Sequence, residues 1–207
     1  MCILGFPAMA SVPTMIVPGD IPAFTPSSAL PPFLGSDPAL SAAMSPYKTS
    51  LTKLVERFAT TPERKGILQG YLDHRAALLS HGITGFQWLD GSFLEDIEAL
   101  EGRPPGDIDI VTFVIRPVHL MNDQAAWDTL ISGNQQIFAP GQAKATYKTD
   151  AYFVDIKFGP GFVIQQTTYW FGLFSHRRIT GLWKGILEIP LTTTADDASA
   201  IALLSTK

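Results

Sequence analysis

The sequence contains a single cysteine, four histidines and few charged residues, and each shortage excludes a class of protein. With Cys2 alone, no intramolecular disulfide can form, so a disulfide-stabilised scaffold is excluded and a reducing, cytoplasmic location is expected. One cysteine with four scattered histidines also excludes zinc-finger spacing. Charged residues make up 16% of the chain and hydrophobic residues 46%, which is typical of a folded protein and not of a disordered one.

Long apolar runs and an early positive charge are also absent. No stretch of about 18 uninterrupted apolar residues exists, so we expect no membrane insertion. The first lysine or arginine is Lys48, whereas a secretory signal begins with a basic region, and Pro7 and Pro13 would break its helix. The net charge of −4 makes the chain a poor candidate for coating long duplex nucleic acid.

Prolines gather at the start of the chain. Residues 1–47 hold nine of the sixteen prolines and only two charged residues. We therefore expect a Pro-rich, irregular N-terminal arm over 1–47, followed by one domain over 48–207. Because the arm is apolar, we expect it to lie on the body of the domain; the alternative is a segment that binds a partner. The apolar residues expected to make that contact are Ile21, Phe24, Leu30, Phe33 and Leu34.

The rest of the chain alternates between helical and extended patterns. Apolar periodicity predicts two helices within 48–81, the second beginning at Thr61-Pro62 as an N-cap and first helical residue. The order that follows predicts an α/β or α+β domain with a small mixed sheet and flanking helices. Strands are expected at 83–89, 107–115, 151–158 and 184–191, and helices at 93–100, 122–132 and 165–176.

Acidic residues within these apolar strands indicate a metal site. Asp107 and Asp109 point to the same face of their strand, because side chains alternate with a period of two. Such close like charges are explained by a divalent cation between them, although an exposed strand edge needs none. Asp155 lies in a second apolar strand and completes a three-carboxylate cluster if the two strands are neighbours. Three such acids can hold two metal ions, Mg²⁺ or Mn²⁺, beside a triphosphate.

A Gly-Ser pair precedes the first of these acids, and fourteen residues separate Ser92 from Asp107. Gly91 allows close approach of the backbone to a ligand, and Ser92 offers a hydroxyl and an N–H at the start of a predicted helix. These groups suit a phosphate, although a simple turn also explains them. Arg177, Arg178 and Lys184 are further candidates for binding the triphosphate; alternatively, the two arginines only end a helix whose dipole favours them.

Together these features resemble the nucleotidyltransferase superfamily typified by DNA polymerase beta. Its signature is Gly-Ser or Gly-Gly, about ten residues, Asp-x-Asp or Asp-x-Glu, and a third acid on a later strand. The resemblance covers residues 83–158 and implies a nucleotidyltransferase fold, with Gly91 and Ser92 at the phosphates. It implies that the catalytic and metal-binding acids are Asp107, Asp109 and Asp155.

A narrower resemblance extends over residues 21–200. The strings FQWLDGSFLE, DIDIVTF and YWFGLFSHRR are similar to a bacterial family of uncharacterised nucleotidyltransferase-like proteins. Proteins of this kind are linked to phage defence or to toxin–antitoxin pairs, which implies a neighbouring-gene effector or toxin as partner. That link comes by analogy within the family, because a fold does not by itself define a function.

The expected activity is transfer of NMP or dNMP from a nucleoside triphosphate to a hydroxyl, with release of pyrophosphate. The acceptor stays open among a partner protein's Tyr, Ser or Thr, a tRNA 3′ end, and another nucleotide, which would give an oligonucleotide product. The alternative is a non-catalytic nucleotidyltransferase-fold antitoxin that neutralises a partner.

Overall fold

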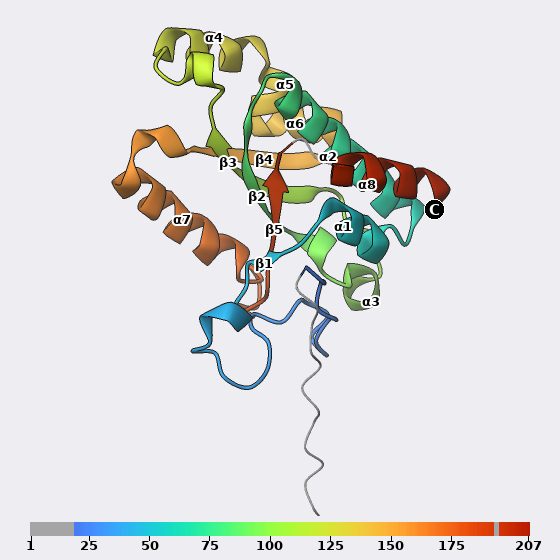
Figure 1. Cartoon of the computed structure of the whole chain (residues 1–207). Coiled ribbons are helices and arrows are strands. Elements are labelled where there is room, and N and C mark those ends of the chain that lie inside the picture. The colour runs from blue at the N-terminus through green and yellow to red at the C-terminus, as the bar shows by residue number, and fades with distance from the viewer. Residues whose placement is uncertain (1–18, 193–194) are drawn as a thin grey trace, which may run out of the picture.

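The computed structural model describes residues 19–192 and 195–207, which form a mixed α/β structure around a five-stranded sheet (Figure 1). The strand order is β1-β5-β2-β3-β4. The central strand β2 is antiparallel to both β3 and β5, while β3 is parallel to β4 and β1 is parallel to β5. The strands are β1 (Tyr47–Lys48), β2 (Thr84–Asp90), β3 (Ile108–Ile115), β4 (Thr149–Asp155) and β5 (Leu187–Leu191).

Helices cover both faces of the sheet. Ile108 and Ile110 of β3 belong to a core cluster with α1, α2 and α8, whereas Val111 and Phe113 pack with α7 on the opposite face. This division follows the alternation of side chains along a strand. The described helices are α1 (Leu51–Phe58), α2 (Pro62–Ser80), α3 (Ile97–Glu101), α4 (Gln124–Gly133), α5 (Gln135–Phe138), α6 (Pro140–Tyr147), α7 (Pro160–Phe174) and α8 (Ala195–Thr206).

The start of α2 has the predicted chemistry. The Thr61 hydroxyl accepts a hydrogen bond from the Arg64 amide, and Pro62 takes the first helical position, where its missing N–H leaves no intrahelical bond unmade. At α1, Asp196 of α8 accepts hydrogen bonds from the backbone amides of Leu51 and Thr52. The C-terminal helix thus satisfies the free donors at the start of a helix 144 residues earlier.

The described part of the N-terminal arm, residues 19–47, lies against the body. Leu30 is buried in the core cluster of α1 and α2, and Ile21, Phe24 and Leu34 pack against that cluster. The Leu30 carbonyl accepts a hydrogen bond of 2.8 Å from the amide of Gly185. Residues 1–18, the remainder of the predicted arm, lie outside the described residues.

Several element boundaries differ from the sequence expectations. The strand expected at 151–158 corresponds to β4, which runs over Thr149–Asp155, because the chain turns into a short 3₁₀ segment at Ile156–Phe158. The run at 93–100 is no single helix, since a 3₁₀ turn at Ser92–Leu94 precedes the short α3. The strand β1 and the helices α5, α6 and α8 are not among the elements expected from the sequence.

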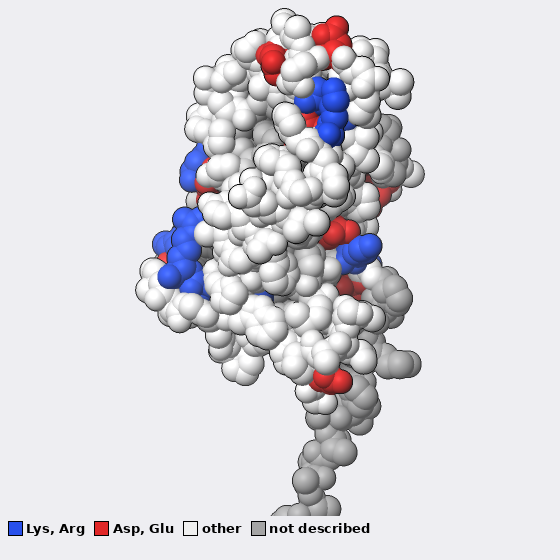
Figure 2. Space-filling view, turned by 90° about the vertical axis from the view of Figure 1, so that its left-hand side faces the viewer, with Lys and Arg blue, Asp and Glu red and all other residues white. Residues whose placement is uncertain are grey.

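The outer face of α7 lacks charge. No Lys, Arg, Asp or Glu occurs from Phe158 to His176, and Figure 2 shows a broad area without charged side chains on this side of the molecule. Ile164 and Tyr169 are among its exposed side chains. Despite this hydrophobicity, no helix among residues 19–192 and 195–207 has the length and apolar character needed to cross a membrane.

We predict opposite effects on stability from two Gly→Ala substitutions within helices. A Cβ at Gly70 of α2 would lie 2.0 Å from the Tyr147 carbonyl oxygen of α6, so Gly70→Ala separates two packed helices and destabilises the fold by roughly 2–3 kcal/mol. A Cβ at Gly172 of α7 meets no atom within 4 Å, so Gly172→Ala is expected to stabilise by up to about 1 kcal/mol. Urea unfolding of both variants measures the difference; equal effects would contradict the close α2–α6 approach.

Candidate functional site

Three aspartates lie side by side across the sheet. Strand register places Asp90 of β2 opposite Asp109 of β3, and Asp109 in turn opposite Asp150 of β4. Asp107 precedes Asp109 by two residues. All four line one pocket of about 300 Å³, and we call this set the acidic row. The predicted convergence of acids from neighbouring strands therefore exists, with a different third member.

Asp155 does not join the acidic row, so the expected placement of this residue is wrong. It lies opposite Val114, five positions along β4 from Asp150, and an odd separation puts the two side chains on opposite faces. Its carboxylate accepts a 2.6 Å hydrogen bond from Nε of the buried Arg116, whose guanidinium lies over the Trp127 ring. In this structure Asp155 is the partner of a buried arginine.

The register explains why Asp150 takes the place expected for Asp155. Parallel strands begin at the same edge of a sheet, so the acid that meets Asp109, near the start of β3, comes from the start of β4. A rule that parallel neighbours align start to start would have selected Asp150 once β3 and β4 were known to be parallel. The sequence alone left that pairing open.

Gly91 is required by the position of Asp109. Its φ of +86° is a conformation that favours glycine, and a Cβ there would lie 1.9 Å from Oδ2 of Asp109. Ser92 also lines the pocket, but it begins a three-residue 3₁₀ turn and not the expected helix. The helix N-terminus predicted at Ser92 is therefore not formed, and so short a turn has no helix dipole to offer a phosphate.

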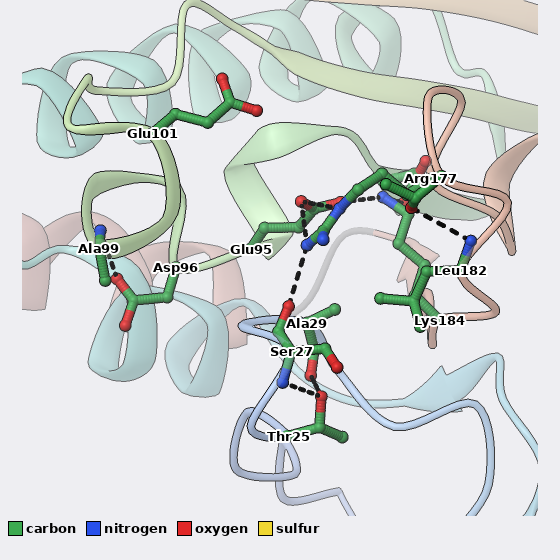
Figure 3. Close-up of polar contacts among 12 residues, drawn as sticks. Thr25, Ser27, Ala29, Glu95, Asp96, Ala99, Glu101, Arg177, Leu182 and Lys184 are labelled. Carbon is green, nitrogen blue, oxygen red and sulfur yellow. Dashed lines mark hydrogen bonds and ion pairs between the residues drawn. The ribbon is translucent and has the colours of Figure 1, made fainter.

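A buried ion network fixes the loop after Gly91 to the segment before β5 (Figure 3). Nζ of Lys184 lies 2.8 Å from Oδ1 of Asp90 and 2.8 Å from Oε1 of Glu95. Nη2 of Arg177 lies 2.8 Å from the other Glu95 oxygen. The Lys184 side chain is 4% exposed, and although burial by itself lowers its pKa, the two carboxylates raise it above the usual lysine value.

The two predicted ligands Lys184 and Arg177 line the pocket but are held by these carboxylates. Arg177 also donates a 3.1 Å hydrogen bond to the carbonyl of Ser27 in the N-terminal arm, so it links the arm to the site. Both cations thus have structural partners, and their charges are balanced by the Asp90 and Glu95 carboxylates.

Arg64 holds the loop that follows Gly91 through hydrogen bonds to its backbone, and the sequence did not indicate this role. From the first turn of α2, its guanidinium donates hydrogen bonds of 2.7 Å to the carbonyls of Phe93 and Glu95. A further 2.7 Å bond joins Nε to the Glu98 carboxylate. No pattern in the sequence distinguishes this buried arginine from the exposed charged residues around it, because only the packing of α2 against the loop places it there.

Two exposed cations at the pocket lie against the acidic row. Lys144 of α6 pairs with the Asp107 carboxylate, and its side chain is 54% exposed. Nη2 of Arg178 lies 3.9 Å from Oδ1 of Asp109, and that side chain is 74% exposed. Unlike Lys184, these two groups are free to turn toward an anion that enters the pocket.

The acidic row has the donor chemistry for a hard divalent cation. Burial raises the pKa of Asp109 to about 7, and the negative charges of the neighbouring aspartates add to that shift. Around Asp109, the positive charge of Arg178 therefore does not balance the carboxylates. Carboxylate oxygens are the ligands that Mg²⁺ and Mn²⁺ prefer. As the side chains lie, however, no three His, Cys, Asp or Glu residues in the described part of the chain are grouped to hold an ion.

Comparison with known protein families gives a match that covers the region of this site. The profile of a family of unknown function, DUF6932, matches residues 22–190. The chain belongs to this family. The DUF6932 match includes the acidic row, Gly91, and the ion network from Ser27 to Lys184. No curated protein and no solved structure matches the chain.

We predict that Asp109→Asn makes stability less dependent on pH. With its folded pKa near 7 and an ordinary value of about 3.9, Asp109 keeps a proton in the folded chain that the unfolded chain loses between these values. Stability of the wild type therefore falls as pH rises through about 4 to 7. At pH 8 the variant is expected to be more stable by up to about 4 kcal/mol, with no difference below pH 4.

Chemical unfolding at pH 4, 6 and 8 measures this difference in stability. The matched control is Asp73→Asn on the exposed side of α2, which makes the same change of charge outside the acidic row. Identical pH profiles for the two variants would contradict the clustering of charge around Asp109.

We also predict that Glu95→Gln destabilises the fold by about 3–5 kcal/mol, because it removes one negative charge from between the buried Lys184 and the partly buried Arg177. Glu101→Gln is the control. This residue lines the same pocket and pairs with Arg103, but its side chain is 41% exposed, so we expect a change within about 0.5 kcal/mol. Thermal and urea unfolding compare the two; a small effect at Glu95 would contradict a structural role for the ion network.

Proposed function

We propose that the chain is a metal-dependent nucleotidyltransferase with a polymerase beta-like fold. It transfers NMP or dNMP from a nucleoside triphosphate to a hydroxyl, with release of pyrophosphate. The observation that supports this most strongly is the acidic row beside the Gly91 loop, in a pocket that basic side chains also line. Acids to hold a cation and bases to attract an anion are the groups that phosphoryl transfer requires.

Asp107, Asp109 and Asp150 are the residues proposed to hold Mg²⁺ or Mn²⁺, two ions per site. Asp150 replaces Asp155 in this proposal because strand register places it beside Asp109. When bound, the cations supply positive charge that neutralises the triphosphate and the developing charge on the leaving group. The raised pKa of Asp109 supports this assignment, since a nearby cation would favour the charged carboxylate that burial and the neighbouring aspartates disfavour.

The chain's own residues orient the reactants and accept the proton. The acceptor oxygen forms a bond to the α-phosphorus, and the bond from that phosphorus to the oxygen shared with the β-phosphate breaks. Pyrophosphate leaves with the electron pair of the broken bond, and the acceptor's proton passes to a carboxylate of the acidic row. Arg178 and Lys144 reach from the pocket rim toward the polyphosphate, while Lys184 and Arg177 stay with Glu95.

Substitution of single aspartates tests the proposal. We expect Asp107→Asn and Asp150→Asn each to lower the rate of nucleotide transfer at least 10³-fold, because each removes a cation ligand. Asp155→Asn, outside the acidic row, is expected to keep the wild-type rate within about threefold below its unfolding temperature. The assay follows labelled NMP from each NTP, with Mg²⁺ or Mn²⁺, into tRNA, a second nucleotide, or the protein encoded by the neighbouring gene.

Two results would contradict this assignment. An unchanged rate in the Asp107→Asn, Asp109→Asn double variant would exclude the acidic row from the chemistry. A loss at Asp155 equal to that at Asp150, with both variants folded, would restore Asp155 as the third acid.

A second candidate function is supported by the pairing of Asp107 with Lys144 and of Asp109 with Arg178. A site in which two of the acids already pair with the chain's own cations suits a non-catalytic, nucleotidyltransferase-fold antitoxin that binds a neighbouring toxin or effector in the cytoplasm. Calorimetry distinguishes the two: heat on mixing with Mg²⁺ and a nucleoside triphosphate supports the enzyme, and no heat with any nucleotide supports the binding protein.

A further inference from the structure

The cations around the acidic row differ in how firmly they are held. Lys184 is buried between two carboxylates that are themselves buried. If its ammonium left, it would remove the positive charge that both carboxylates share. Lys144 has one carboxylate partner in the acidic row and a side chain that is more than half exposed. The ammonium of Lys144 can therefore exchange Asp107 for water or for an anion while it stays in contact with solvent, whereas Oδ2 of Asp107 is buried and needs another cation in its place.

The backbone that carries Lys144 is nevertheless fixed. Ala143 beside it is fully buried, and the carbonyl of Lys144 accepts a 3.0 Å hydrogen bond from the amide of Lys148 at the end of α6. The carbonyl of Lys148 in turn accepts a bond from the amide of Ile108, the first residue of β3. Lys144 and Asp107 are thus held at a constant backbone separation, and only the side chain of Lys144 needs to move.

The ammonium of Lys144 also lies where a cation is needed. The acidic row brings carboxylates from three neighbouring strands together, with Asp90 opposite Asp109 and Asp109 opposite Asp150. Asp107 is the member of the row that an exposed lysine reaches directly. This contact gives a physical reason why the carboxylates, as they lie, are not grouped around a metal position.

We propose that Lys144 is a displaceable internal counter-ion of the cation site. Its ammonium holds the Asp107 carboxylate while the site is empty, gives it up to a divalent cation, and then turns to the phosphate groups of the nucleotide. This inference rests on the proposed function, since it concerns the same pocket. It makes Lys144 a positioning residue, whose removal changes cation binding separately from the chemical step.

The exchange predicts a coupling between the two ligands. Without nucleotide, the divalent cation competes with Lys144 for Asp107, so its affinity is reduced. With nucleotide, the displaced ammonium gains phosphate partners, so each ligand strengthens the binding of the other. Removing the ammonium is expected to strengthen cation binding alone and to weaken the coupling.

Binding of Mn²⁺, followed by electron paramagnetic resonance of the free ion, tests this in the full-length chain. We expect Lys144→Met to bind Mn²⁺ about fivefold more tightly than the wild type without nucleotide, the effect of losing one half-exposed ion pair. A non-hydrolysable nucleoside triphosphate is expected to raise Mn²⁺ affinity more in the wild type than in this variant. The control is Lys148→Met, which removes the same charge at the end of α6 but does not line the pocket.

The outcomes separate the inference from the proposed function. If the wild type binds Mn²⁺ and Lys144→Met binds it no more tightly, the counter-ion role is wrong and the enzyme proposal stands. If Lys148→Met tightens binding as much as Lys144→Met, net charge is the cause and the counter-ion role is again wrong. If neither the wild type nor Lys144→Met binds Mn²⁺, the cation site and the inference both fail.

Discussion

The buried Glu95 carboxylate is the interaction on which the site depends. It receives Lys184 and Arg177 from the segment before β5, while Arg64 of α2 holds its backbone carbonyl. Through Arg177 the same network reaches the N-terminal arm at Ser27. The network around Glu95 thus joins four segments that are distant in sequence: the N-terminal arm, α2, the loop after Gly91 and the segment before β5. Because unpaired ions are costly to bury, this network holds the Gly91 loop beside the acidic row and specifies one arrangement of the segments.

The acidic row shows how a mixed sheet concentrates charge. The end of β2 meets the start of β3 because these strands are antiparallel, and the start of β3 meets the start of β4 because those are parallel. Acids from three strands therefore share one edge of the sheet. The fixed cations beside the row pair with Asp90 and Glu95, and exposed cations at its rim remain able to contact a ligand. That division suits a site that binds both a metal ion and a polyanion.

Local chemistry allowed much of the fold to be predicted. The Thr61-Pro62 start of α2 depends on neighbouring residues alone, and the structure confirms it. The requirement for glycine at position 91 was also foreseen, although the group that approaches it is the Asp109 carboxylate and not a ligand. Asp155 was chosen because its apolar neighbours indicate a strand; the choice failed because local pattern does not reveal which residues of two strands lie opposite each other.

By itself, the sequence determined the composition of a folded α/β protein, four of the five described strands, the helices α1, α2, α4 and α7, and the Asp-x-Asp pair at the start of β3. Each of these follows from propensities and periodicities that act over a few residues. Only the tertiary structure decided that Asp150 joins Asp109, that Asp155 pairs with Arg116, and that Lys184 is buried between two acids. Strand register and ion burial bring together residues far apart in the chain, so their outcome depends on the packing of the whole molecule.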